Sequence, residues 1–230
     1  MPEAMAGTAI FALDRTLTRS GTWSRYMFSV NRGRPSFYLR LPFLLLHAIA
    51  YKIGLFSRQS VKEHGLKTLA WAQKEDLETA AYRFAEQEFE HGLRHQTQHV
   101  LEKHRARGDR LVMATAAAEL VAKPMAELLG MDVLICTELD WSPDGRLTGK
   151  LAGPNCYGQA KLDLILAANA KHSFAAPMTG YSDHVSDLPF LQWVDEGVAV
   201  NPSRGLARFA AKAGIRIEDW DSDNMGSENT

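Results

Sequence analysis

Short apolar runs that alternate with helical patterns are the feature that most constrains the fold of this chain. Each run ends in, or directly before, Gly, Asp, Asn or Thr, as buried parallel strands commonly do. These runs lie at residues 8–13, 110–115, 132–137, 174–180 and 197–201. The helical patterns lie at residues 118–129, 159–170 and 203–213. Gly130 and Gly214 follow two of these patterns and favour helix ends. The alternation predicts an α/β fold with a doubly wound parallel sheet.

The stretch from residue 20 to residue 108 interrupts this alternation. It shows helical spacing, many charged and amide side chains and no convincing strand. Because it leaves after the first expected strand and returns before the second, it should stand over the carboxyl ends of the strands, where doubly wound sheets place their sites. We therefore expect a discontinuous core (1–19 and 109–220), a helical cap (20–108) and a disordered polar tail (221–230). A hairpin is expected around the Ser-Pro-Asp-Gly turn at residues 142–145.

The bulk composition excludes several functional classes. The chain has 230 residues, of which 46% are hydrophobic, enough for one core and a smaller appended domain. The formal net charge is -1, so no overall field attracts a polyanion and we expect no nucleic-acid partner. Cys136 and Cys156 lack metal-ligand spacing, and the amino terminus lacks the basic start of a signal peptide. These features predict a cytoplasmic protein.

A motif at the end of the first expected strand points to a chemistry. Residues 10–17 are Ile-Phe-Ala-Leu-Asp-Arg-Thr-Leu. This segment resembles the first motif of the haloacid dehalogenase superfamily, an apolar strand followed by Asp-x-Asp-x-Thr, with Ala12 at the first aspartate position and Asp14 at the second. Three further motifs of that superfamily are matched in the same order by Thr115, by Lys161, and by Asp183 with Asp187. Residues 137–156 and 197–220 are also similar to subfamily IB, the branch that includes phosphoserine phosphatases.

The resemblance implies a magnesium-dependent phosphomonoester phosphatase that works through an aspartyl-phosphate intermediate. In such an enzyme the first aspartate attacks phosphorus, and Asp14 protonates the leaving oxygen and later activates water. Thr115 and Lys161 would hold the phosphoryl oxygens. Mg²⁺ would be held by the nucleophile, the Asp14 backbone carbonyl and Asp183, with Asp187 of the same acidic motif as a further metal-site residue.

Each of these residues also has a purely structural interpretation. Asp14 is compatible with a turn cap, Thr115 with an ordinary strand end, and Asp187 with the N-cap of a helix beginning near Pro189. Lys161 is more informative, because it is expected in the first turn of a helix, where a cation opposes the macrodipole. Asp183 and Asp187 place two like charges together, which favours a bound cation.

Ala12 removes both the attacking oxygen and one carboxylate ligand of the metal, so this chain should be inactive. Two explanations are open: an engineered knockout of the nucleophile, or a natural pseudoenzyme that binds a phosphorylated ligand without turnover. Retention of the other motif residues favours the engineered origin. A phosphotransferase that uses an alcohol as acceptor would need the same residues.

The substrate is not defined by the motifs. A small phosphomonoester of the phosphoserine kind is one candidate. The segment Gly180–Leu191 is also similar to that of bacterial phosphatidylglycerophosphate phosphatases of type C, which makes a phospholipid head-group phosphate the other. The apolar stretch at residues 41–56, flanked by Arg and Lys, is compatible with a helix buried in the cap or with peripheral contact to the inner membrane surface. It is too short and too interrupted to span a bilayer.

Overall fold

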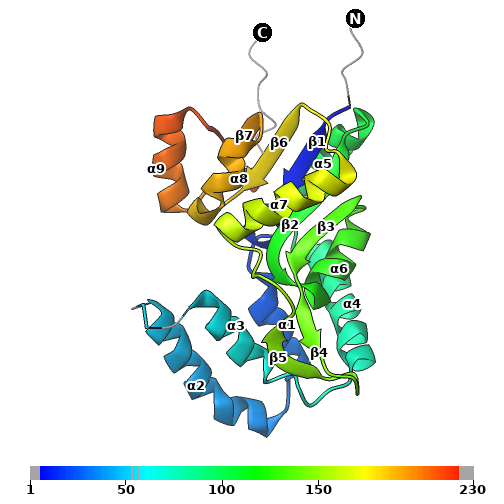
Figure 1. Ribbon diagram of the computed structural model, residues 1–230, viewed down its shortest axis with the longest axis vertical. Coiled ribbons are helices and arrows are strands. Elements are labelled where there is room, and N and C mark those ends of the chain that lie inside the picture. Colours follow the sequence, from blue (N-terminus) through cyan, green and yellow to red (C-terminus); the bar gives the residue numbers. More distant parts are fainter. Residues whose placement is uncertain (1–5, 53, 56, 223–230) are drawn as a thin grey trace, which may run out of the picture.

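The computed structural model describes residues 6–52, 54–55 and 57–222 and has the expected α/β architecture (Figure 1). Six parallel strands form one sheet in the order β3-β2-β1-β6-β7-β8. The strands are β1 (Thr8–Phe11), β2 (Arg110–Ala118), β3 (Val133–Thr137), β6 (Met178–Ser182), β7 (Glu196–Val200) and β8 (Arg216–Glu218). The prediction of a parallel α/β sheet is confirmed.

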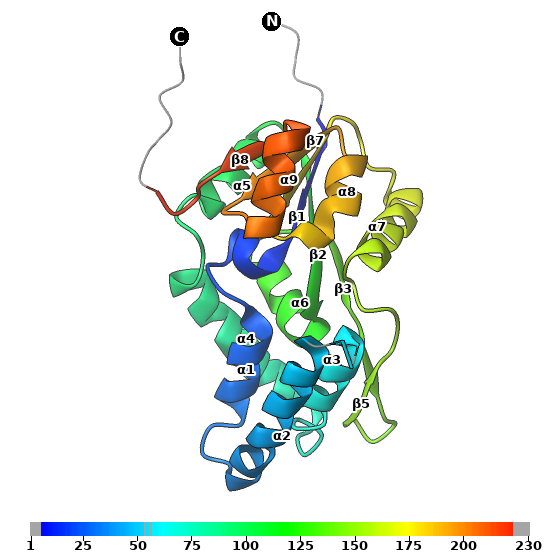
Figure 2. The same cartoon turned by 90° about the vertical axis from the view of Figure 1, so that its left-hand side faces the viewer.

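Helices cover both faces of this sheet. Successive strand residues point to opposite sides, and because they are apolar on both sides, both faces need to be buried. In β1, Ile10 packs with residues of the helices on one face, whereas Ala9 and Phe11 pack with residues of the helices on the other. The first face carries α7 (Gln159–His172), α8 (Leu188–Trp193) and α9 (Arg204–Ala213). The second carries α5 (Thr97–Ala106) and α6 (Glu119–Leu128). This is the doubly wound arrangement, and Figure 2 shows it from the side.

The residues between β1 and β2 form helices that reach beyond the sheet. They are α1 (Thr22–Val30), α2 (Pro35–Lys52), α3 (Arg58–Leu66), α4 (Lys74–His91) and α5. In Figure 1, α1, α2 and α3 lie beyond the end toward which β1 points, together with the hairpin β4 (Leu139–Trp141) and β5 (Leu147–Leu151). By contrast, α4 packs along α6 and α5 packs on β2, so the later part of this segment is joined to the core. We call α1, α2 and α3 the cap helices, and the limits of a separate cap stay a prediction.

Two segments differ from the sequence expectations. Asp221 and Ser222, placed in the expected disordered tail, make hydrogen bonds with Asp219, and residues 223–230 lie outside the described residues. Most of the apolar stretch at residues 41–56 lies in α2, where Phe43, Leu45 and Leu46 of the stretch are exposed. The interpretation of this stretch as a helix buried in the cap is therefore wrong. No helix among the described residues is long and apolar enough to cross a membrane.

A buried histidine lies where α5 meets the sheet. His104 Nδ1 is 2.7 Å from Asp109 Oδ2, and its Nε2 is 2.9 Å from the hydroxyl of Tyr181. Burial lowers the pKa of His104 below its usual value, and the nearby Arg107 lowers it further, although the hydrogen bond to Asp109 acts in the opposite sense. The imidazole is thus buried in its neutral form.

This burial predicts a pH-dependent stability. Because the folded-state pKa of His104 lies below the unfolded value of about 6.5, the unfolded chain binds the proton more readily, and stability is lost as the pH falls below about 6.5. The contribution of His104 to this slope is at most about 1.4 kcal/mol per pH unit. Urea unfolding of the unaltered chain and of His104→Gln, measured at pH values from about 6.5 downward, should show that the unfolding free energy of the variant depends less steeply on pH. Equal slopes would contradict the prediction.

Candidate active site

The residues singled out by the motifs come together around one cavity at the carboxyl ends of the strands. This cavity has a volume of about 260 Å³. Its lining includes Ala12, Asp14, Thr115, Lys161, Asp183 and Asp187. Since these residues come from four separate segments, their convergence follows from the parallel sheet, which brings the ends of β1, β2 and β6 to one edge.

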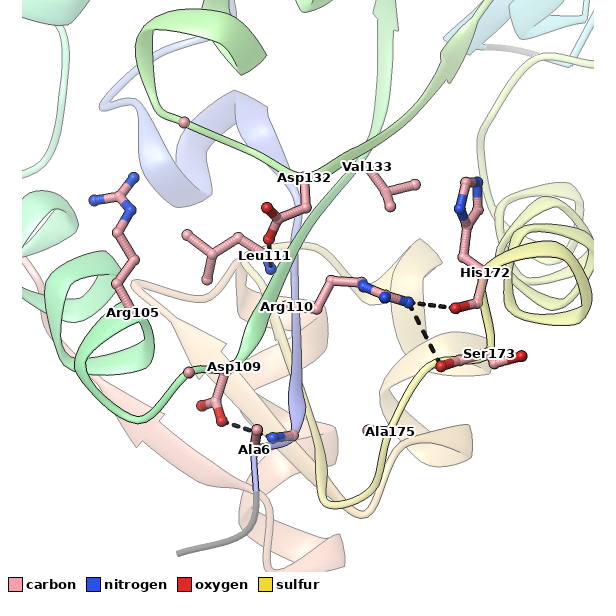
Figure 3. Close-up of a pocket in the computed structure, with 13 residues that line it drawn as sticks. Ala6, Arg105, Asp109, Arg110, Leu111, Asp132, Val133, His172, Ser173 and Ala175 are labelled. Carbon is pink, nitrogen blue, oxygen red and sulfur yellow. Dashed lines mark hydrogen bonds between the residues drawn. The ribbon is translucent and has the colours of Figure 1, made fainter.

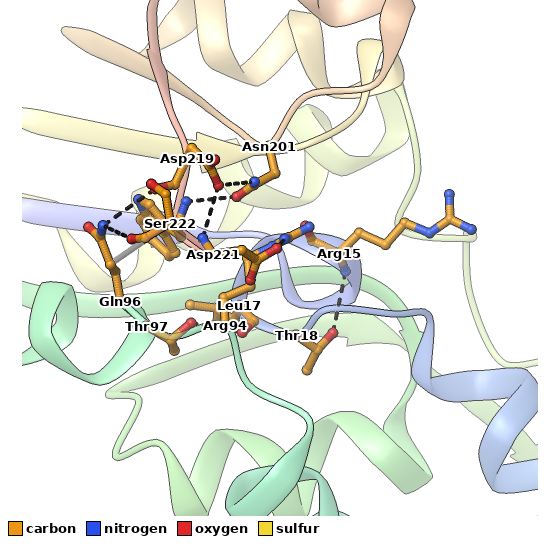
Figure 4. Close-up of polar contacts among 11 residues, drawn as sticks. Arg15, Leu17, Thr18, Arg94, Gln96, Thr97, Asn201, Asp219, Asp221 and Ser222 are labelled. Carbon is orange, nitrogen blue, oxygen red and sulfur yellow. Dashed lines mark hydrogen bonds and ion pairs between the residues drawn. The ribbon is translucent and has the colours of Figure 1, made fainter. Parts of the chain in front are cut away.

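The loop after β1 has an unusual backbone that aims its residues at the cavity. Arg15 has a φ of 61°, in the left-handed region that non-glycine residues seldom occupy. The guanidinium of Arg94 stabilises this turn by donating to the Arg15 carbonyl from Nη2 at 2.6 Å and from Nε at 3.0 Å. Arg94 also pairs with Asp221, and Figure 4 shows this contact network. Arg94 has no motif of its own, so the sequence did not reveal its part in shaping the loop.

Asp14 is oriented by the first residue of α1. Its Oδ1 accepts hydrogen bonds from the backbone amide and the hydroxyl of Thr22, both at 2.7 Å. Hydrogen bonds to a charged acceptor are stronger than those between neutral groups. The carboxylate is therefore held at the boundary between the sheet and the cap helices. Thr22 is a second functional residue that the sequence did not indicate.

Lys161 and Asp187 form a buried ion pair beside the cavity. Lys161 Nζ is 2.7 Å from Asp187 Oδ2, and the two side chains are 4% and 5% exposed. The same oxygen accepts a hydrogen bond from the Ser182 hydroxyl at 2.7 Å. Asp187 stands at the N-cap position of α8 but makes no side-chain capping hydrogen bond. Its carboxylate instead pairs with Lys161, which lies in the first turn of α7 as expected.

Asp183 is a buried carboxylate whose ionised form is disfavoured by its surroundings. Its Oδ1 accepts a hydrogen bond from the Thr16 hydroxyl at 3.3 Å, and its amide donates to that hydroxyl at 3.1 Å. Burial and the charge of Asp187 raise the pKa of Asp183 to about 6. A cation beside Asp183 would favour the ionised carboxylate, so Asp183 is suited to act as a ligand of a metal ion.

The donors on the cavity wall fit magnesium, but with one carboxylate fewer than the family motif supplies. Mg²⁺ is commonly held by one or two carboxylates, with water and phosphate oxygens completing the octahedron. Asp183 and the backbone carbonyl of Asp14 offer oxygen ligands, whereas the methyl group of Ala12 offers none. Among the described residues no group of three or more His, Cys, Asp or Glu side chains forms a ready-made metal cluster. A magnesium ion bound here would therefore take its remaining ligands from phosphate oxygens and water.

Thr115 lies at an irregularity of β2. The pairing register between β2 and β3 shifts between Ala114 and Ala118, and Thr115 Oγ1 accepts a hydrogen bond from the Ala117 amide at 3.0 Å. The Thr115 side chain lies at the cavity. Since a hydroxyl that accepts one hydrogen bond can still donate its own proton, Thr115 suits contact with a phosphoryl oxygen.

A larger cavity of about 630 Å³ lies at the opposite end of the sheet, where β2 and β3 begin (Figure 3). Its polar side chains are engaged by backbone groups. Asp109 accepts from the Gly7 amide at 2.8 Å, Asp132 accepts from the Leu111 amide at 2.7 Å, and Arg110 donates to the His172 carbonyl. These contacts hold strand ends together. Because ligand sites of open parallel sheets lie at the carboxyl ends of the strands, the smaller cavity is the candidate site.

Comparisons with known proteins agree with this geometry. Residues 9–192 match the profile of the haloacid dehalogenase-like hydrolases. The chain is 25% identical to the histidinol-phosphatase of Neisseria meningitidis serogroup C over 91% of this chain and 97% of that protein. A crystal structure of a protein of unknown function from Bordetella pertussis Tohama I has a TM-score of 0.82 and 28% identity, and the match covers 94% and 99% of the two chains. A substrate-bound phosphoserine phosphatase shares the fold, with a TM-score of 0.67, 17% identity and coverage of 95% and 96%.

The buried ion pair makes a testable prediction about stability. Lys161→Met leaves the Asp187 carboxylate buried without its cation, which should cost about 3 to 5 kcal/mol of unfolding free energy. Lys161→Met combined with Asp187→Leu should recover most of that loss, because neither charge then remains buried. Urea unfolding of the two variants measures both values. Equal destabilisation by the single and double changes would show that the pair is not coupled.

Proposed function

Because the chain belongs to the haloacid dehalogenase-like hydrolase family, we propose that it has the scaffold of a magnesium-dependent phosphomonoester phosphatase whose nucleophile position is occupied by Ala12. The observation that carries this proposal is the convergence of Asp14, Thr115, Lys161 and Asp183 around one cavity at the end of β1. The name of the Neisseria relative supports hydrolysis of a phosphate ester of an alcohol.

The residues have distinct roles in the proposed reaction. Lys161 and Thr115 hold the phosphoryl oxygens, and Asp187 and Ser182 keep the Lys161 ammonium in place. Asp183 and the Asp14 carbonyl would hold Mg²⁺, and an ion there would help to neutralise the charge of the phosphoryl group. This holding function does not require the nucleophile.

Bond formation does require it. A carboxylate at position 12 would attack phosphorus and form an acyl phosphate, while the bond to the leaving oxygen breaks and Asp14 gives that oxygen a proton. Asp14 would then take a proton from water, which attacks phosphorus and releases phosphate and the free carboxylate. The methyl group of Ala12 cannot start this sequence, so we propose that the present chain binds a phosphorylated ligand and does not turn it over.

Restoring the carboxylate tests this proposal. Ala12→Asp should gain phosphate release from a phosphomonoester panel, and chelation of divalent cations with EDTA should abolish it. The matched control is Ala12→Asn, which has nearly the same volume as aspartate but lacks the carboxylate. Activity in both variants, or in the unaltered chain, would contradict the assigned role of position 12.

The acid–base role of Asp14 is tested in the same background. Asp14→Asn in the Ala12→Asp chain should lower kcat by about 10²- to 10⁴-fold, the usual contribution of general acid–base catalysis. The loss should be smaller for a substrate whose leaving group needs no protonation, such as p-nitrophenyl phosphate. Losses of the same size for nitrophenyl and alkyl phosphates would argue against proton donation by Asp14.

Two alternatives are separated by these measurements. A natural pseudoenzyme stays inert after Ala12→Asp but binds phosphate or a phosphomonoester. A phosphotransferase gains activity and, when an alcohol such as glycerol is added, forms a phosphorylated alcohol at the expense of free phosphate.

A further inference from the structure

One face of α2 carries a stripe of apolar side chains that are exposed to solvent. Leu39, Phe43 and Leu46 are 75%, 63% and 61% exposed and follow one another at helical spacing. Other members of the stripe are Tyr38, Leu45 and Ile49. Contiguous apolar patches on an otherwise polar protein surface mark interaction sites. Figure 1 shows α2 at the edge of the molecule, on the far side of α3 from the hairpin.

The charge around this stripe has one sign. Between Asp14 and Glu63 the sequence contains no acidic residue, and every charged side chain is Arg or Lys. Arg32 and Arg40 are exposed at the start of the helix region. The whole chain has a net charge of -1, so this segment is a local concentration of positive charge. An apolar helix face in a segment whose charged residues are all basic complements the surface of an anionic bilayer.

The opposite face of α2 lines an apolar cavity that adjoins the candidate active site. This second cavity has a volume of about 370 Å³. Phe37, Leu41 and Leu44 of α2 line it, and Trp23 and Met27 of α1 lie across from them. It shares Asp14 and Ala116 with the active-site cavity, so the two spaces adjoin at these two residues.

The place where the cavities meet indicates what the apolar space holds. Under the proposed function, on which this inference rests, Asp14 donates a proton to the leaving oxygen, so the leaving group extends from the phosphate toward Asp14. Beyond Asp14 lie the apolar walls of the second cavity. A leaving group that continues into this space must be largely apolar to gain from burial there.

We propose that α2 docks on an anionic lipid bilayer and that the ligand of the site is a lipid-like phosphomonoester whose apolar part enters the cavity between α1 and α2. The phosphate reaches Asp14 and Lys161, and the chain lies between the cap helices. Docking through α2 brings the cavity that this helix lines next to the lipid phase. A bilayer fits better than a protein partner, because the face combines aliphatic and aromatic side chains with a chain segment whose charged residues are all basic.

Vesicle binding tests the docking. The unaltered chain should cosediment with vesicles of equal parts phosphatidylglycerol and phosphatidylcholine, and more weakly at high salt or with phosphatidylcholine alone. Phe43→Glu combined with Leu46→Glu should weaken binding by about tenfold or more, since two apolar contacts are lost and two negative charges are added. The matched control is Leu166→Glu, which changes a 40% exposed leucine on α7. Circular dichroism would verify that both variants are folded.

Several outcomes would overturn the docking. These are no binding to the anionic vesicles, or equal binding by the α2 double variant and the unaltered chain. Sedimentation equilibrium tests whether a second copy of the chain occupies this face instead. An unaltered chain that dimerises and a double variant that is monomeric would assign the face to that second copy.

The ligand class is tested with the Ala12→Asp chain and a series from glycerol 3-phosphate to phosphatidic acids of increasing acyl length, each kept below its micellar concentration. We expect kcat/KM to rise by about two- to fourfold per added methylene until the cavity is filled. Activity on glycerol 3-phosphate that does not increase with chain length overturns this inference and leaves the proposed phosphatase intact. Inertness toward the whole series, with activity on other members of the phosphomonoester panel, overturns the lipid substrate and leaves the proposed phosphatase intact. Inertness toward both the series and the panel, with vesicle binding retained, overturns the proposed phosphatase and its lipid substrate but not the docking of α2.

Discussion

The charge balance at the carboxyl edge of the sheet is the constraint on which the rest of the site depends. Asp14, Asp183 and Asp187 are brought to one cavity, and the ammonium of Lys161 neutralises Asp187 directly. The pKa of Asp183 is raised, first by burial of its carboxyl and then by the charge of Asp187. Such an arrangement would stabilise a bound cation and a phosphoryl group together, because each would offset the charge of the other.

Much of the fold could be predicted from the sequence because buried parallel strands are apolar along their whole length. The strand expected at residues 174–180 is the informative exception, since it begins at Met178. Pro177 lacks an amide proton and cannot donate to the sheet, so an apolar run that contains it does not enter the ladder as a whole. The edge strand Arg216–Glu218 was not predicted because it is short, and Arg216 and Ile217 are exposed.

The site shows a similar division. Asp14, Thr115, Asp183 and Asp187 were predicted because they match short family motifs at or just after strand ends, and Lys161 because it matches a motif in the first turn of a helix. The structure places all five at one cavity. The residues that position them were not predicted, because their contacts span the chain. Arg94 is 79 residues from the Arg15 carbonyl that it binds, and Thr22 orients Asp14 from a different element. Periodicity also could not decide whether α2 was buried, because an apolar stretch has the same sequence in a core and on an exposed face.

A lysine of the cap helices makes hydrogen bonds to the core at the wall between the two cavities. Lys62 of α3 lines the apolar cavity, and its ammonium donates to the Ala116 carbonyl, to Thr137 Oγ1 at 3.1 Å and to Asn155 Oδ1 at 2.6 Å. Ala116 belongs to the wall that both cavities share, so Lys62 ties a cap helix to the strand end that carries Thr115. A displacement of the cap helices would therefore disturb the phosphate end of the site as well as the leaving-group end. The contacts of Lys62 thus join α3 to the core beside Thr115.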